Sequence, residues 1–147
     1  MDIKNYALKL LKYRARSEKE LRSKLESKGF KKEEIEELIL EFKEKGFIDD
    51  EKFSYLFAYD KLTLQKKGPK FIEWELLKLG VDRQVVEKAI FRVLQEVDEE
   101  KIIKEIVIRE KIDLKNSKEK RKLYLKLLRR GFNHYSIESA IESLFDN

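Results

Sequence analysis

The stretch GFIDDEKF, residues 46–53, places two aspartates and a glutamate beside a glycine in a chain crowded with lysine and glutamate. Such an acidic group is either a metal or catalytic site or the boundary between two helices. Upstream, residues 35–42 carry apolar side chains with the i, i+3, i+4, i+7 spacing of one helix face. Gly46 can adopt the left-handed conformation that ends such a helix. The surrounding pattern therefore favours a helix boundary.

Each residue of this stretch then has a local structural role. Phe47 and Phe42 form the apolar contact of a Schellman turn around Gly46. Asp49 is the N-cap of the next helix and accepts hydrogen bonds from its first backbone N–H groups. Asp50 lies in the first helical turn, where the helix dipole favours negative charge. Since adjacent helical positions point in different directions, we predict a structural role for both aspartates and no metal site.

Composition limits both the fold class and the chemistry. The 147 residues include one proline, five glycines and no cysteine, and 41% of them are hydrophobic. So few turn residues argue against a β-rich fold, and the lack of cysteine excludes disulfides and thiolate metal sites. The first residues lack a signal-peptide run and no segment is apolar enough to span a bilayer, so we expect a cytoplasmic protein. The net charge of +5 is compatible with a nucleic-acid or acidic-protein partner.

The helix boundary at Gly46 belongs to a larger pattern, because the chain repeats with a period of 51 residues. Gly29, Gly80 and Gly131 are separated by this interval. Apolar residues recur four and eight positions before each of these glycines, and one, six, nine, ten and thirteen positions after it. Internal repeats of this kind predict tandem structural units. In each unit, one helix ends at the glycine and another begins two residues later.

Start signals precede each of these paired helices. Ser17 and Glu20 form a capping box, and Pro69 stands at a permitted first helical position. Ser117 is a weaker start signal for the third unit. Another helical segment comes before each start, at residues 3–15, 50–65 and 99–112. The last of these contains a β-branched run at 106–108, but the surrounding isoleucines favour a helix.

We therefore predict an all-α protein with nine helices in three tandem three-helix repeats. The predicted repeats cover residues 1–48, 49–98 and 99–147. A unit of about 50 residues has a small core, so packing against its neighbours should help it to fold.

Basic residues gather on the first helices, on the corners that lead into the second helices, and on the second helix of the third repeat. Residues 3–17 and 61–72 contain no acid, and residues 115–130 contain only Glu119 against eight basic residues. This recurrence predicts a basic strip for phosphate or an acidic protein surface, although each cluster alone also fits a solvated helix face. The residues assigned to the strip are Arg14, Arg16, Lys66, Lys67, Lys70, Arg121, Lys122, Lys126, Arg129 and Arg130.

Patterns typical of catalysis are missing from the sequence. His134 is the single histidine and lies beside a predicted N-cap, and the five glycines all fall at helix ends. Aromatic residues on the predicted helices are expected to be core or partly buried: Tyr6, Tyr13, Tyr55, Tyr59 and Trp74. We predict a binding protein with no catalytic residues and no cofactor.

Several segments resemble the RecX family of bacterial RecA regulators. They are residues 6–29 (YALKLLKYRARSEKELRSKLESKG), 46–61 (GFIDDEKFSYLFAYDK), 66–81 (KKGPKFIEWELLKLGV) and 120–141 (KRKLYLKLLRRGFNHYSIESAI). The most specific motifs are Gly-aromatic-Ile-Asp-Asp-x-x-Phe at 46–53 and Ser-x-x-Glu-Leu at 17–21. Many members have Gly-Tyr-Gly-Pro where this chain has Lys67-Gly68-Pro69, so this loop departs from the family pattern.

The resemblance implies an elongated, curved array of three-helix repeats in the helical groove of the RecA–DNA filament. Such proteins typically block filament extension, ATP hydrolysis, strand exchange and the coprotease function that triggers the SOS response. The expected partner is the RecA filament on DNA, with weak direct DNA binding, and the protein is expected to be a monomer with no membrane contact. The alternative is a direct nucleic-acid-binding protein with helix-turn-helix-like corners. Six glutamates at 33–44 disfavour a recognition helix in the first repeat.

Overall fold

The computed structural model describes residues 1–146, which form nine α-helices and no strand. The prediction of an all-helical chain is confirmed, including residues 102–108, which lie within a helix. The helices are α1 (Ile3–Tyr13), α2 (Glu18–Lys28), α3 (Lys32–Glu44), α4 (Asp50–Thr63), α5 (Pro69–Lys78), α6 (Arg83–Glu96), α7 (Glu99–Glu110), α8 (Ser117–Arg129) and α9 (His134–Phe145).

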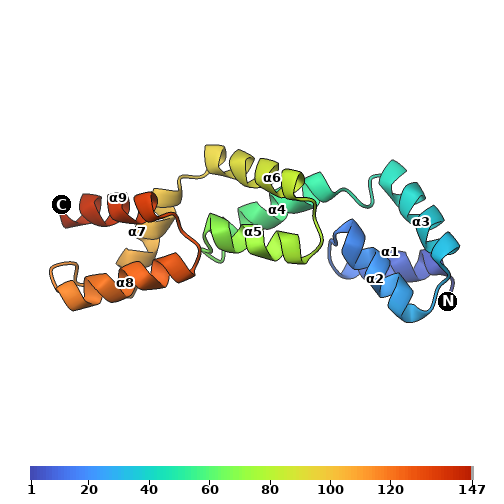
Figure 1. The fold of residues 1–147 in the computed structure, drawn as a ribbon, viewed down its shortest axis with the longest axis horizontal. Helices are drawn as coiled ribbons and strands as arrows, with labels where there is room; N and C mark the ends of the chain where they lie inside the picture. Colours follow the sequence, from blue (N-terminus) through green and yellow to red (C-terminus); the bar gives the residue numbers. More distant parts are fainter. Residues whose placement is uncertain (147) are drawn as a thin grey trace.

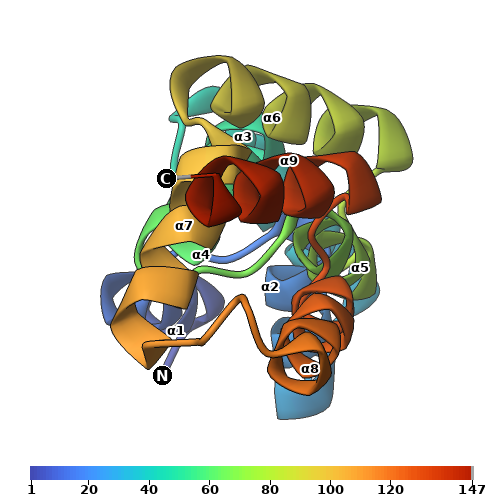
Figure 2. The ribbon, with the colours of Figure 1, turned by 90° about the vertical axis from the view of Figure 1, so that its left-hand side faces the viewer.

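The helices follow one another along the long axis as three groups of three, so the molecule is an elongated array (Figure 1). Viewed along that axis, corresponding helices fall into three rows (Figure 2). The first helices α1, α4 and α7 form one row, the second helices α2, α5 and α8 another, and the third helices α3, α6 and α9 the last. The predicted architecture is confirmed, while the exact repeat boundaries stay a prediction.

Glycine ends the helix at all four predicted positions. Around Gly46, the N–H of Phe47 donates to the Phe42 carbonyl at 2.8 Å, and the glycine N–H donates to the Lys43 carbonyl at 3.1 Å. This pair of bonds is the Schellman motif, and it recurs around Gly29, Gly80 and Gly131. All four glycines have φ between +77° and +100°, a region that L-residues avoid.

The predicted helix starts are correct for α2 and α5 and need one correction for α8. Ser17 Oγ accepts from the Glu20 N–H and the Glu20 carboxylate accepts from the Ser17 N–H, which completes the capping box. Pro69 is the first residue of α5. Ser117, however, is the first residue of α8 and not its cap. The Asn116 side chain caps α8 instead, because its oxygen accepts from two backbone N–H groups.

The apolar positions of the 51-residue period build the core. The residues four before and six after each glycine are all buried: Leu25, Leu76, Leu127, Ile35, Val86 and Ile137. They belong to two separate clusters. One cluster lies within the first repeat, from Ala7 to Ile48, and the other runs continuously through the second and third repeats, from Phe53 to Ile141. The last two repeats therefore share a core that the first does not.

Three of the five aromatic residues predicted to be core or partly buried lie on the surface instead, and Tyr59 is the least exposed of them at 38%. Trp74 is 56% exposed and Tyr13 is 82% exposed. On α5, Ile72 and Leu76 occupy the buried face, and position 74 is rotated by about 200° from both because each helical residue turns the chain by about 100°. The indole is thus placed on the opposite, outward face of the helix.

Candidate partner-binding surface

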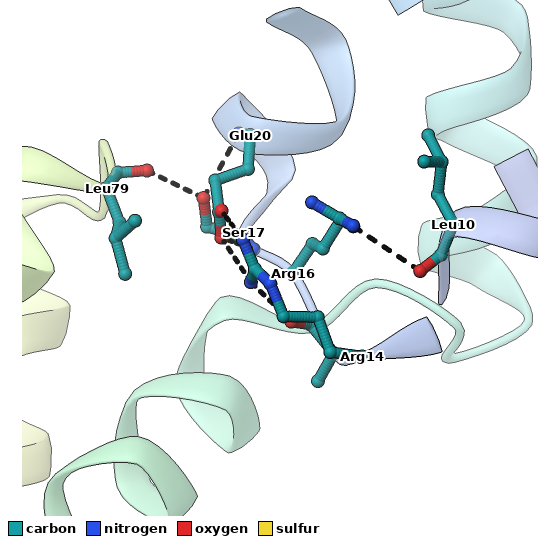
Figure 3. Close-up of polar contacts among 7 residues, drawn as sticks. Leu10, Arg14, Arg16, Ser17, Glu20 and Leu79 are labelled. Carbon is teal, nitrogen blue, oxygen red and sulfur yellow. Dashed lines mark hydrogen bonds and ion pairs between the residues drawn. The ribbon is translucent and has the colours of Figure 1, made fainter. Parts of the chain in front are cut away.

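The first and second repeats meet where the start of α2 contacts the end of α5 (Figure 3). The Ser17 hydroxyl donates to the Leu79 carbonyl at 2.6 Å. The Lys19 side chain packs so closely on Gly80 that a Cβ at this glycine would collide with it. Gly80 is therefore required both for its positive φ and for the close contact between repeats.

The second and third repeats meet at positions that lie 51 residues further along the chain, because Gly68–Arg130 corresponds to Ser17–Leu79 and Lys70–Gly131 corresponds to Lys19–Gly80. The Gly68 N–H donates to the Arg130 carbonyl at 2.7 Å, and the Lys70 N–H donates to the Gly131 carbonyl at 3.0 Å. A Cβ at Gly68 would collide with the backbone of Gly131 and Phe132. Because the two junctions lie at equivalent positions, the second helices follow one another in a single row (Figures 1 and 2).

The two aspartates of GFIDDEKF stabilise the starts of two different helices. The Asp49 carboxylate accepts from the backbone N–H groups of Glu51 and Lys52, as predicted for the N-cap of α4. The Asp50 carboxylate instead accepts from the Glu18 backbone N–H at 2.9 Å, and so caps α2 of the preceding repeat. Burial raises the pKa of Asp50 above its ordinary value. This second capping contact joins the first two repeats.

Arg14 and Arg16 of the predicted basic strip hold the loop between α1 and α2 (Figure 3). Arg14 pairs with the Glu20 carboxylate at 2.5 Å, and this hydrogen bond raises the pKa of the guanidinium. Arg16 is only 7% exposed, and its Nε donates to the Leu10 carbonyl at 3.4 Å. Assigning Arg16 to an exposed strip is therefore wrong for this conformation, because its side chain is covered.

Three further residues of the strip make polar contacts within the chain. Lys66 pairs with Glu105 at 2.8 Å, and the ammonium lowers the pKa of that carboxylate. The Arg130 guanidinium donates to the carbonyls of Gln65 and Lys66, which fixes the turn between α4 and α5 against the third repeat. Lys126 pairs with Glu110. Half of the ten predicted strip residues thus make polar contacts within the chain, at a loop, at a junction between repeats or, for Lys126, between α8 and the end of α7.

Four of the remaining five residues are exposed and one is half-buried. Lys70, Arg121, Lys122 and Arg129 are exposed, and the described part of the chain offers them no ion-pair partner. Lys67 is half-buried, with its ammonium 4.9 Å from the centre of the Phe71 ring. Partner binding by this group stays a prediction, and four of its members lie on α5 and α8 or at their ends.

Exposed residues of α2, α5 and α8 form a stripe that we call the second-helix ridge. Within each helix the members are four residues apart, so they lie on one face. Between helices they are 51 residues apart. All nine are exposed and none is acidic: Lys19, Ser23, Ser27, Lys70, Trp74, Lys78, Arg121, Leu125 and Arg129. The ridge retains three of the ten predicted strip residues and adds Lys19 and Lys78.

Trp74 lies at the centre of the second-helix ridge. Its ring centroid is 6.0 Å from that of Phe71, and the Lys78 ammonium is 4.7 Å from the indole centroid. An exposed aromatic ring beside cations is a frequent feature of binding surfaces. The sequence analysis missed the exposure of Trp74, although the 51-residue period aligns Lys70, four residues before it, with Lys19 and Arg121.

A shallow hollow of about 320 Å³ joins the first two segments of the ridge. It lies between α2 and the end of α5, and its lining includes Lys19, Lys24 and Lys78. Three cationic side chains from two repeats therefore surround one concave surface, and the one acidic residue of the lining, Glu20, is paired with Arg14. This arrangement favours an anionic group as the occupant.

The row of third helices differs from the ridge in charge and polarity. Six glutamates lie on α3. Helix α9 carries two glutamates and, apart from His134, no basic residue. Leu40 of α3 and Phe91 of α6 are exposed and lie 51 residues apart. The molecule thus presents a basic row and a partly apolar third-helix row that is acidic on α3 and α9 and of mixed charge on α6, where Arg83, Lys88 and Arg92 accompany two glutamates. The acidic helices α3 and α9 do not suit direct reading of DNA bases.

Residues 1–146 contain neither a cluster of metal-ligating side chains nor a membrane-spanning helix. No group of three or more potential metal-ligating side chains converges there. Within the same residues, no helix combines the length and apolar character needed to cross a bilayer. His134, the single histidine, contacts the Tyr124 hydroxyl and lies 3.7 Å from the Glu138 carboxylate.

Comparisons of the sequence and of the structure with known proteins both find RecX proteins. Residues 4–41 match the first three-helix domain of RecX and residues 49–90 match the second. The regulatory protein RecX of Thermotoga maritima is 41% identical over 140 residues, which cover 95% of this chain and 83% of that protein. The corresponding protein of Caldanaerobacter subterraneus is 33% identical over 95% of this chain and 69% of its own length.

Solved structures extend the similarity to the third repeat. The crystal structure of RecX from Lactobacillus salivarius matches with a TM-score of 0.86 and 25% identity, over 99% of this chain and 96% of that one. With two family domains matched in order, and with relatives similar along almost the whole chain, the protein belongs to the RecX family of regulatory proteins.

Proposed function

We propose that this protein binds the RecA–DNA filament and inhibits its extension, ATP hydrolysis, strand exchange and coprotease function. The observation that carries the proposal is family membership, with 41% identity to a regulatory RecX protein over 95% of the chain. A filament offers the same surface repeatedly along its axis. An elongated array of three similar repeats is suited to contact several such surfaces at once, so that modest contacts add together.

Inhibition by this route needs occupancy of a surface and no chemical step. The junctions fix the three repeats relative to one another through Ser17, Gly68 and Arg130. A partner therefore meets a surface that is already arranged, which lowers the entropic cost of binding. The second-helix ridge offers positive charge, and the third-helix row offers exposed apolar side chains and glutamates. We infer that the protein is a regulator and not an enzyme.

The direct test is the DNA-dependent ATPase of the cognate recombinase, measured on single-stranded DNA with and without this protein. We expect the steady-state rate to fall as the protein is added and to reach a plateau near one protein per binding site on the filament. No change in the rate at saturating concentrations, together with no binding to coated DNA, would overturn the proposal.

A charge-reversed variant tests the surface that is involved. Lys70→Glu with Arg129→Glu changes two exposed ridge residues, whereas Lys9→Glu with Lys52→Glu changes two exposed residues of the first-helix row. Both variants should keep the helical content of the parent, checked by circular dichroism. We expect the ridge variant to lose inhibition and the control to retain it. Equal loss in both would assign the effect to net charge alone.

A further inference from the structure

Helix α5 presents a basic and aromatic face in the middle of the molecule. Lys70, Trp74 and Lys78 are each exposed and follow one another at intervals of four residues. At a rise of about 1.5 Å per residue, the two lysines are separated by about 12 Å along the helix, with the indole between them. The Lys78 ammonium lies over the indole at 4.7 Å, and more than half of Trp74 remains accessible.

The junctions add positive charge at both ends of this face. At the first junction, Lys19 and Lys24 of α2 line the same hollow as Lys78. At the second junction, the Lys70 backbone is bonded to Gly131, two residues after Arg129. The cations thus gather at the two ends of α5 and the aromatic surface lies between them.

Acidic residues next to this face are paired with residues outside it. Glu20, beside Lys19, pairs with Arg14, and Glu73, beside Trp74, pairs with Arg83 at 3.1 Å. These carboxylates are therefore partly neutralised by their partners, and they reduce the positive electrostatic potential of the ridge only slightly. The fixed arrangement of the junctions means that the pattern exists before any partner binds.

This pattern matches single-stranded nucleic acid better than an acidic protein surface. A single strand alternates anionic phosphates with flat bases, and proteins bind it with a basic groove and aromatic side chains on which bases stack. An acidic protein surface would satisfy the lysines but would leave the indole without a matching group. Duplex DNA would likewise offer phosphates without accessible base faces.

We propose that the second-helix ridge is a binding site for single-stranded DNA, with phosphates held by Lys70 and Lys78 and a base stacked on Trp74. This inference deepens the proposed function, since it names the DNA of the filament as the component that the ridge contacts. Binding to a bare oligonucleotide is tested without recombinase, so the inference and the proposed function can fail separately.

Trp74 is the single tryptophan of the chain and reports directly on the site. We expect its fluorescence to be quenched when an oligothymidylate of about 20 nucleotides is added at low salt, because stacking brings a base against the indole. An abasic oligomer with the same number of phosphates should bind more weakly and should quench little. Polyglutamate of matched charge serves as the mimic of an acidic protein surface and should not quench.

Variants separate stacking from phosphate binding, with affinity measured by anisotropy of a labelled oligonucleotide. Trp74→Ala should weaken binding roughly five- to a hundred-fold. Lys70→Gln with Lys78→Gln should reduce the slope of log affinity against log salt by about 1 to 1.5, since each single-strand phosphate contact contributes about 0.7. Lys9→Gln with Lys52→Gln is the matched control and should leave the slope unchanged.

Three results would overturn the inference. The first is no quenching of Trp74 even at low salt, and the second is equal quenching by polyglutamate, which would assign the ridge to an acidic protein. The third is equal loss of affinity in the ridge and control variants. If oligonucleotide binding follows the ridge while recombinase ATPase is unaffected, the inference stands and the proposed function fails. If the ATPase is inhibited without oligonucleotide binding, the reverse holds.

Discussion

At the residue scale, the two aspartates of GFIDDEKF show how similar side chains take different roles. Asp49 caps its own helix, whereas Asp50 caps a helix that begins 32 residues earlier. The first role was predictable, since an N-cap depends on a few neighbouring residues. The second was not, because it depends on how two repeats pack. The burial of Arg16 was unpredictable for the same reason.

Replacement of Asp49 by alanine tests the capping role. The change removes the acceptor for the N–H groups of Glu51 and Lys52, and we expect the free energy of unfolding to fall by about 0.5 to 2 kcal/mol. Chemical denaturation of the two proteins measures this difference. Divalent cations should not alter the melting temperature of the parent, and a marked rise with Mg²⁺ or Ca²⁺ would show that the aspartates bind metal.

Replacement of Asp50 by asparagine tests the effect of its burial. The pKa of Asp50 is raised in the folded state, so the folded protein binds this proton more tightly than the unfolded chain does. The resulting stabilisation is complete below the ordinary aspartate pKa of about 3.9 and is lost as pH rises through the raised value. Asparagine can still accept the Glu18 N–H but does not titrate.

The stability of the parent relative to Asp50→Asn should therefore increase as pH falls from 7 to 4. The neighbouring charges Glu18, Lys43 and Asp49 are common to both proteins, so their own titration largely cancels in the comparison. Urea denaturation at several pH values gives the difference directly. A difference that stays constant, or that changes in the opposite direction, would contradict the assigned effect of burial.

At the scale of the helices, contacts at equivalent positions of the 51-residue period join each pair of repeats. The positions of the helices were largely predictable from the 51-residue period, because caps and apolar spacing are local signals. The orientation of α5 was less predictable. The rotation of Trp74 away from Ile72 and Leu76 follows from helical geometry. Whether a neighbouring repeat covers the indole depends on how the repeats pack, and Trp74 remains exposed.

Replacement of Gly68 by alanine should disturb the junction between the second and third repeats. Its φ is negative, so alanine causes no backbone strain, but the added Cβ collides with Gly131 and Phe132. Gly29→Ala is the matched control, because φ is +100° there and the space around the position is open. Both changes should destabilise the protein, by roughly 1 to 3 kcal/mol for the collision and roughly 1 to 2 kcal/mol for the left-handed strain.

Amide chemical shifts distinguish these two causes. Gly68→Ala should shift the signals of residues 130–132, which belong to the neighbouring repeat, because the bond from the Gly68 N–H to the Arg130 carbonyl is displaced. Gly29→Ala should leave those signals in place. Unchanged signals at 130–132 in the Gly68 variant would show that the repeats do not meet there in solution.

At the scale of the whole molecule, the division of the core predicts unequal stability. The second and third repeats share one apolar cluster, while the first repeat has its own. The contacts between the first two repeats include the polar bonds of Ser17 and Asp50. We therefore expect α1–α3 to open before α4–α9, as smaller cooperative units do in other proteins.

Native-state hydrogen exchange measures this order of opening. Amides in α1–α3 should share a lower free energy of opening than the most protected amides of α4–α9. Asp50→Asn affects the junction directly and serves as a probe of coupling between the two parts. A single opening energy for all buried amides would show that the three repeats unfold as one unit.

The central claim is that an elongated array of three-helix repeats recognises recombinase-coated DNA through the second-helix ridge. Its most direct test is a salt titration of binding to recombinase-coated DNA, naked single-stranded DNA and naked duplex. We expect tightest binding to the coated form, weaker binding to the naked single strand, and a loss of both in Lys70→Glu with Arg129→Glu. Equal or tighter binding to naked duplex, with no change in recombinase ATPase, would contradict the claim.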